Sequence, residues 1–83
     1  MTQVSATAVE KSVVEWLRTE LDDAEITGSD NFLDVGGHSL VFSKLNEFLH
    51  GSFGVVLDQR TTYGEPLGVA VAAARPIDEP TTR

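Results

Sequence analysis

The chain contains no cysteine and few basic residues, and these two deficits exclude several kinds of protein. Without cysteine there is neither a disulfide nor a thiolate nucleophile, and cysteine usage gives no indication of the compartment. Six Lys and Arg against thirteen Asp and Glu give a formal net charge of −7. This charge argues against nucleic acid and anionic membrane surfaces as partners, because both would repel it. It favours partners that carry basic patches.

Long apolar segments and a signal sequence are also missing. The longest apolar run, residues 69–74, is far too short to span a bilayer. Residues 1–5 show no basic stretch followed by an apolar core, so no secretory signal is visible. We therefore expect a cytoplasmic protein. Its 83 residues suffice for one domain with a modest core, but not for a buried active site.

Three stretches repeat apolar residues at helical spacing, and they predict helices over residues 6–21, 39–50 and 66–75. A single short helical turn is expected at 61–64. The side chains that these helices should bury are Val13, Trp16, Leu17, Leu45, Leu49 and Val71, with Tyr63 reaching the core from the short turn. Residues 1–5 and 76–83 are expected to be flexible, which leaves 6–75 as the domain.

Short local signals mark the ends of these helices and the connection between the first two. Thr7 and Glu10 have the form of a capping box, and Gly51 is a C-cap candidate. Residues 22–38 are rich in turn formers and follow no period, which predicts a long first loop. The side chains expected to fold this loop back onto the helices are Ile26, Phe32, Leu33 and Val35.

The end of this loop carries the most informative pattern in the chain. Gly36 and Gly37 close the loop, and the helical spacing begins directly after Ser39. A serine at or near a helix N-cap can bond to the unpaired amides of the first turn. The partial positive charge at this end of a helix also suits a phosphate ester. Taken alone, a capping serine after a glycine turn is the more common interpretation.

The amino-acid sequence of residues 30–40 favours a more specific interpretation. Gly36-Gly37-His38-Ser39-Leu40, preceded by the Asn-Phe-Leu-Asp of residues 31–34, resembles the core motif of peptidyl carrier proteins, the thiolation domains of nonribosomal peptide synthesis. The likeness runs from about residue 9 to about residue 74 and is specific over residues 30–40. His38 resembles the peptidyl class, because fatty-acid and polyketide carriers usually have aspartate there.

Two positions depart from the usual pattern of that family. Val35 replaces a leucine, and Leu67 stands where threonine or serine commonly follows the proline of the last helix. Neither residue touches the attachment site. They therefore bear on local details of the loop and the last helix rather than on the class.

The resemblance implies a covalent cofactor and a fold. Ser39 would carry a 4′-phosphopantetheine arm derived from coenzyme A, whose thiol holds an aminoacyl or peptidyl group as a thioester. The implied fold is all-α: a small right-handed bundle of three main helices plus one short helix, with a long first loop and no sheet. Residues 53–57 would form a connecting loop, since one short apolar run cannot make a sheet alone.

The partners follow from the same resemblance, and the helical wheel indicates where they would dock. A phosphopantetheinyl transferase would attach the arm, and adenylation, condensation, thioesterase or tailoring enzymes would act on the cargo. The chain itself would be a non-catalytic monomer. On the wheel, Leu40, Ser43 and Glu47 project away from the apolar stripe and Lys44 flanks it. Together with His38 they form the candidate docking surface.

Two other functions would also fit parts of this pattern. A polyketide or fatty-acyl carrier would share the fold and the arm, and an unmodified helical adaptor would share the fold alone. A hydrolase is disfavoured, because Ser39 lacks the second glycine of a nucleophile elbow and His38 is adjacent in sequence. His50 lies about three helical turns from Ser39. Two such separated histidines do not build a zinc site without cysteines.

Overall fold

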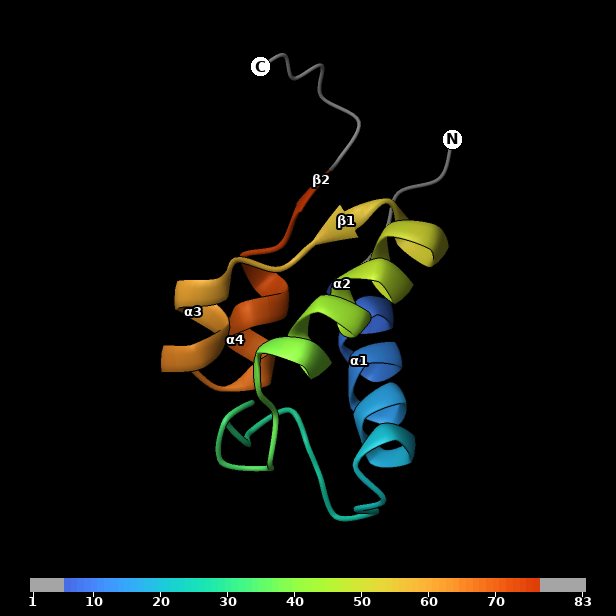
Figure 1. The fold of residues 1–83 in the computed structure, drawn as a ribbon. Coiled ribbons are helices and arrows are strands. Elements are labelled where there is room, and N and C mark those ends of the chain that lie inside the picture. The colour runs from blue at the N-terminus through green and yellow to red at the C-terminus, as the bar shows by residue number, and fades with distance from the viewer. Residues whose placement is uncertain (1–5, 77–83) are drawn as a thin grey trace.

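The computed structural model describes residues 6–76 of the chain. The elements follow the order α1 (Ala6–Glu20), α2 (Ser39–Phe53), β1 (Val55–Val56), α3 (Gln59–Gly64), α4 (Leu67–Ala72) and β2 (Arg75–Pro76). Figure 1 shows the residue 22–38 loop at one end of the molecule and the two short strands at the opposite end. The prediction of a small all-α fold with a long first loop is confirmed. The segments predicted to be flexible are 1–5 and 76–83, and all of them except Pro76 lie outside the described residues.

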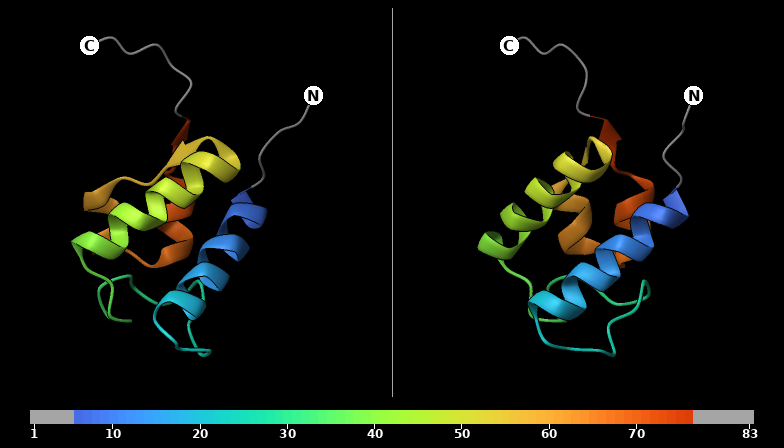
Figure 2. Two further views of the ribbon diagram at one scale, coloured as in Figure 1. Left: turned by 45° about the vertical axis from the view of Figure 1, so that its right-hand side comes forward. Right: turned by 90° about the vertical axis from the view of Figure 1, so that its right-hand side faces the viewer.

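Helix α1 packs one apolar face against α2 and α4, as Figure 2 shows from two sides. Val9, Val13 and Leu17 are buried as the helical spacing predicts, and Val14 is buried with them. Trp16 is only half-buried, although it was predicted to be in the core. Its indole lies at the edge between the two long helices and stacks on Phe48 of α2, with ring centroids 6.0 Å apart.

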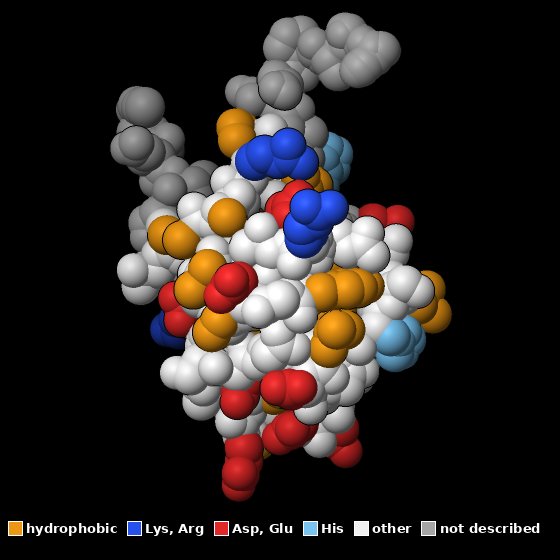
Figure 3. Space-filling view, turned by 90° about the vertical axis from the view of Figure 1, so that its left-hand side faces the viewer, with side chains coloured by type: hydrophobic (Ala, Val, Ile, Leu, Met, Phe, Trp, Pro, Cys, Tyr) orange, Lys and Arg blue, Asp and Glu red, His pale blue; other side chains and the backbone are white. Residues whose placement is uncertain are grey.

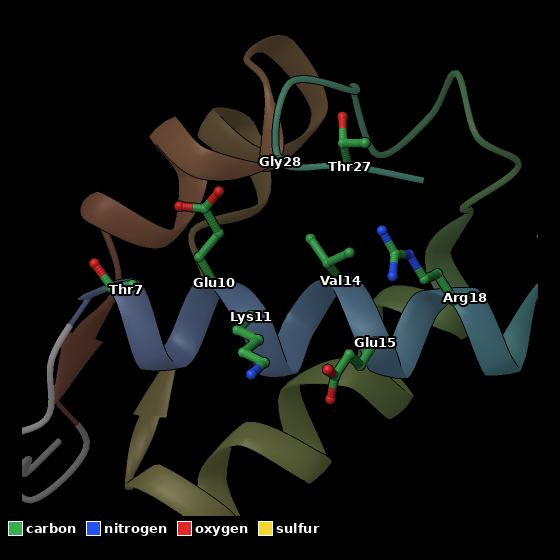
Figure 4. A pocket seen from close by; sticks show the side chains of 8 residues that line it. All are labelled: Thr7, Glu10, Lys11, Val14, Glu15, Arg18, Thr27 and Gly28. Atoms are coloured by element: carbon green, nitrogen blue, oxygen red, sulfur yellow. The ribbon is translucent and has the colours of Figure 1, made fainter. Parts of the chain in front are cut away.

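The N-terminal capping box predicted for α1 does not form. The helix already includes Ala6, so that Thr7 lies inside its first turn. The Glu10 side chain rises from α1 toward the long loop and lies against Gly28, as Figure 4 shows, and no hydrogen bond joins it to Thr7. A tertiary contact with the loop therefore replaces the local bond that the sequence suggested.

Helix α2 is longer than predicted because Gly51 does not end it. The helix continues to Phe53, and Gly54 takes the left-handed conformation with φ of 70°. The Gly54 amide donates to the carbonyl oxygens of Leu49 and His50, which closes the last turn. Val41, Leu45 and Leu49 face the core, as the periodicity predicts. None of the helices in residues 6–76 is long and apolar enough to cross a membrane.

The connection after α2 corrects the prediction of a fold with no sheet. Val55 and Val56 pair antiparallel with Pro76 and Arg75, respectively. The chain end returns beside this segment, so that one short apolar run does find a second strand. The next residue, Leu57, is hydrogen-bonded to the Asn46 carboxamide. Asn46 Oδ1 accepts from the Leu57 amide at 2.8 Å, and Asn46 Nδ2 donates to the Leu57 carbonyl at 3.3 Å.

The last two helices have different ends from those predicted. Helix α3 begins at Gln59 because the Asp58 carboxylate caps it and accepts the Thr61 amide at 2.9 Å. Helix α4 ends at Ala72, so that the predicted end at residue 75 is wrong. The residues that follow turn into β2, and Pro76, predicted to start the tail, is paired with Val55. Leu67, Ala70 and Val71 are buried.

The long loop is attached to α4 rather than free. The Leu67 amide donates to the Asp30 carbonyl at 2.8 Å, and the Gly68 amide donates to the Gly28 carbonyl at 2.9 Å. Ile26 and Phe32 are buried as predicted, and Val35 is half-buried against the core. Leu33 was predicted to pin the loop as well, but its side chain is 43% exposed. Turn geometry places it outward.

Candidate functional site

Ser39 is the first residue of α2, and it lies at the end of the molecule that holds the long loop (Figure 1). It is exposed, as are His38 and Leu40 on either side. Its hydroxyl has no hydrogen-bond partner among residues 6–76. The alternative interpretation of Ser39 as a capping residue is therefore not supported, since Ser39 lies one residue inside the N-cap. The oxygen is left available to an external reactant.

His38 occupies the N-cap position of α2 in an extended conformation, with φ of −155° and ψ of −177°. Its carbonyl oxygen accepts the Phe42 amide at 2.8 Å, which forms the first turn. Its side chain makes no capping hydrogen bond. The first-turn amides of this 15-residue helix therefore have no side-chain acceptor within the described chain. An anionic group on Ser39 would meet free N–H donors and the positive end of the helix dipole.

The two glycines before His38 are required for different reasons. Gly36 has φ of 107°, a conformation that side-chain-bearing residues rarely adopt. Gly37 has an ordinary backbone, but a Cβ there would lie 2.5 Å from Cε2 and Cζ of Phe32. The Phe32 ring thus lies directly behind the turn that leads to Ser39. One glycine permits the turn, and the other allows the turn to lie on the aromatic ring.

Phe32 belongs to a cluster of three rings that supports this turn from the inside. Its ring centroid is 5.7 Å from that of Tyr63, in stacked orientation, and 5.9 Å from that of Phe42, edge to face. Tyr63 and Phe42 complete the triangle at 5.6 Å. The Tyr63 hydroxyl is buried within this region and has no hydrogen-bond partner among residues 6–76. Aromatic packing of this kind adds about 0.5–1.5 kcal/mol per pair to simple burial.

Asn31 holds the outer side of the same turn through its carboxamide. The Oδ1 atom accepts from the Leu33 amide at 2.8 Å and from the Asp34 amide at 3.1 Å. The Nδ2 atom donates to the Tyr63 carbonyl at 3.0 Å and to the Glu65 carbonyl at 3.2 Å. The sequence prediction missed this role. The bonds to Leu33 and Asp34 follow the familiar turn pattern of asparagine, and that pattern was the available signal.

The five predicted docking residues all lie on the surface, around Ser39 and along α2. His38 and Leu40 flank Ser39, and the Leu40 side chain is 62% exposed. Ser43 and Glu47 are exposed on the same helix, one and two turns further on. Lys44 is exposed as well, but its Nζ atom lies 2.9 Å from Glu20 Oε2 of α1. Lys44 therefore also joins the two long helices, a role that the sequence did not suggest.

Charge is unevenly distributed around this site. Figure 3 shows acidic side chains gathered at the lower end of one face, where the long loop lies, and Lys and Arg side chains at the upper end. The acidic residues of the loop are Asp22, Asp23, Glu25, Asp30 and Asp34. Ser39 thus follows an acidic segment. A partner that approaches Ser39 over this loop would gain from a basic surface.

Two hollows in the described part of the chain lie away from Ser39. A groove of about 340 Å³ lies between α1 and the loop, with Val14 as its floor (Figure 4). Glu10 and Arg18 point toward the loop from this helix, and Arg18 Nε donates to the Ile26 carbonyl at 2.9 Å. None of the predicted site residues lines the groove. Within residues 6–76, no group of three His, Asp or Glu side chains is placed to hold a metal ion.

What this arrangement offers chemically is one accessible hydroxyl on a firmly held turn. Comparison of the chain with protein-family models, with curated proteins and with solved structures finds no match. The functional argument therefore depends on the residues themselves and on the geometry around Ser39.

Proposed function

We propose that the protein is a peptidyl carrier protein, modified at Ser39 with a 4′-phosphopantetheine arm that holds an aminoacyl or peptidyl group as a thioester. The observation that carries the proposal is the exposed Ser39 hydroxyl without a partner among the described residues, at the open N-terminus of α2. A serine that served only as a cap would bond to the first-turn amides, and Ser39 does not.

The chemistry of attachment makes few demands on this chain. The Ser39 Oγ would attack the β-phosphorus of coenzyme A, the bond to the bridging oxygen would break, and adenosine 3′,5′-bisphosphate would leave. The hydroxyl proton would pass to a base of a phosphopantetheinyl transferase, whose magnesium would neutralise the developing charge. The carrier supplies position and access. The free amides at the start of α2 favour the phosphodiester that results.

The proposed partners meet the carrier around Ser39. His38, Leu40, Ser43, Lys44 and Glu47 form the docking surface that transferase, adenylation, condensation, thioesterase or tailoring enzymes would share. Such contacts are small and transient, because each enzyme must release the carrier to the next. We propose that Leu40 is the apolar centre of this surface. The monomeric state and the cytoplasmic location remain predictions from the sequence.

Intact mass spectrometry tests the proposal. The protein is incubated with coenzyme A, magnesium and a transferase of broad specificity, beside Ser39→Ala and the control Ser52→Ala, an exposed serine of α2 outside the docking surface. We expect one phosphopantetheine adduct on the wild type and on Ser52→Ala, and none on Ser39→Ala. Ser39→Ala should change the free energy of unfolding by less than about 0.5 kcal/mol, since no cap bond is lost. An unmodified wild type would identify a helical adaptor, and modification of Ser39→Ala would place the site elsewhere.

A second measurement separates the two kinds of carrier. The modified protein is offered aminoacyl and malonyl donors with their loading enzymes, and the thioester is detected by mass. We expect aminoacyl loading, because His38 stands where polyketide and fatty-acyl carriers usually have aspartate. Loading with malonyl alone would favour the polyketide or fatty-acyl alternative.

A further inference from the structure

The Asn31 carboxamide uses all four of its hydrogen-bonding positions, two as acceptor and two as donor. Its acceptor oxygen shapes the turn that follows it, through the amides of Leu33 and Asp34. Its amide nitrogen reaches across the chain to the carbonyls of Tyr63 and Glu65, 32 and 34 residues away. One side chain thus fixes the turn internally and also fastens it to the connection between α3 and α4.

This fastened turn leads without interruption to Ser39. The Val35 amide donates to the Asn31 carbonyl at 3.2 Å, and the Gly37 amide donates to the Phe32 carbonyl at 2.9 Å. Gly37 is buried, whereas His38 and Ser39 are exposed. The backbone that sets the direction of Ser39 therefore has its last firm attachment only two residues before it. If the two donor bonds of Asn31 were lost, the turn would keep only its backbone contacts with the start of α4, namely the Asn31–Pro66 bridge and the bonds that Leu67 and Gly68 donate to the loop.

We propose that Asn31 is a positioning residue, which holds Ser39 in the geometry that accepts the phosphopantetheine group. This inference rests on the proposed function and goes beyond it, because it assigns a role to a residue that does not touch the reactants. The effect is indirect. Asn31 sets the fraction of molecules in which the turn lies against the α3–α4 connection, and Ser39 reacts from that state.

Asn46, in the middle of α2, provides a matched control that does not contact the turn before Ser39. Its carboxamide also bridges to backbone, with one bond accepted from and one donated to Leu57. Both asparagines are half-buried. Asn31→Ala and Asn46→Ala each remove a whole carboxamide. Asn31→Asp and Asn46→Asp each remove the donor and add one negative charge near a carbonyl oxygen, but keep the acceptor.

The kinetic test measures transfer from coenzyme A over a range of carrier concentrations, with rates expressed per folded molecule. A smaller competent fraction raises the apparent KM for the carrier and leaves kcat at saturation unchanged. For Asn31→Ala and Asn31→Asp we expect KM to rise roughly tenfold, as two ordinary hydrogen bonds allow. The Asn46 variants should keep the wild-type KM. A general loss of stability would not move KM per folded molecule.

Amide hydrogen exchange provides a measurement that needs no modification. Asn31→Ala should speed exchange of the Leu33 and Asp34 amides, and Asn31→Asp should spare them because its acceptor oxygen remains. If the wild type is modified and the Asn31 variants match the Asn46 variants in KM, the positioning role is overturned. If the wild type is not modified at all, the proposed function fails, and the positioning role falls with it. The hydrogen-exchange rates would still show whether Asn31 holds the turn.

Discussion

Replacement of Gly37 by alanine tests whether the turn before Ser39 depends on its contact with Phe32. The added Cβ would lie 2.5 Å from two ring carbons of Phe32, well inside normal contact distance. The ring has little room to withdraw, because Phe32 is fully buried and packs between Tyr63 and Phe42. Either the turn must lift away from the ring or the three rings must repack.

The size of the effect follows from this crowding. Forcing an extra carbon into a well-packed site costs about 1–3 kcal/mol. A domain of this length has roughly 4–12 kcal/mol of stability in total. For so small a domain, each kcal/mol shifts the melting temperature by about 4–8 °C. We therefore expect Gly37→Ala to melt roughly 5–20 °C below the wild type.

Gly51→Ala is the matched control, because it makes the same chemical change in the opposite environment. Gly51 lies inside α2, and no atom would come within 4 Å of its added Cβ. Alanine is favoured over glycine in a helix by about 0.5–1 kcal/mol, so this variant should be more stable than the wild type. Thermal and urea unfolding, followed by circular dichroism and by Trp16 fluorescence, would measure both changes.

The double variant decides whether Phe32 causes the loss. In a Phe32→Leu background the ring is absent, and Gly37→Ala should cost clearly less than it does in the wild type. Equal costs in both backgrounds would show that the ring is not responsible. A Gly37→Ala protein as stable as the wild type would refute the close packing of the turn on the aromatic cluster.

Two further predictions concern the surface around the site and the cap of α3. Leu40→Ala should change the free energy of unfolding by less than about 0.5 kcal/mol, because the side chain is 62% exposed, while it slows transferase and loading kinetics. A large loss of stability with unchanged kinetics per folded molecule would contradict its docking role. The amide and hydroxyl of Thr61, together with Arg75 and Arg60, hold the pKa of Asp58 below its usual range. The cap therefore contributes stability above the ordinary carboxyl pKa of about 3.9, and this contribution is lost as the pH falls below it. Asp58→Asn should lose less stability than the wild type between pH 5 and pH 2, measured by urea unfolding, and equal acid sensitivity would contradict this origin.

The helices were predictable where the apolar spacing is long, and their ends were not. Residues of α1 and α2 repeat apolar side chains over four turns, so that tertiary packing and local pattern agree. The sequence offered two glycines, Gly51 and Gly54, at which α2 could end, and the local sequence does not distinguish them. Only Gly54 reaches the left-handed conformation with both closing bonds, and the return of β2 beside β1 favours that end. Pairing between segments that are distant in the sequence cannot be recognised from the local sequence of either segment.

The site was predictable in its exposed part but not in its support. Ser39, His38 and Leu40 follow from a motif and from helical spacing. Phe32 and Leu33 are neighbours in an irregular loop, and without a period nothing in the sequence decides which one points inward. The long-range bonds of Asn31 join segments more than thirty residues apart. Such contacts depend on the finished fold, which is why the sequence prediction missed them.

The residues that hold the turn, Phe32 and Asn31, lie before Ser39, and the reactive hydroxyl of Ser39 itself is exposed. This arrangement explains how so small a domain can offer a defined site without a cleft. The turn before Ser39 is held from the inside by Phe32, whose contacts reach Gly37, and from the outside by Asn31, which bonds to Leu33 and Asp34. The side chains of His38, Ser39 and Leu40 are exposed, and none of them makes a capping bond with the described residues. A partner enzyme therefore meets a hydroxyl whose backbone is already ordered, and it need not expend binding energy to order the loop. If this ordering is what the domain contributes to the proposed modification, then variants that loosen the turn should resemble one another in KM even though they act on different faces. Gly37→Ala and Asn31→Ala provide that comparison. A wild-type KM in either variant would show that the reactivity of Ser39 does not depend on the order of the turn.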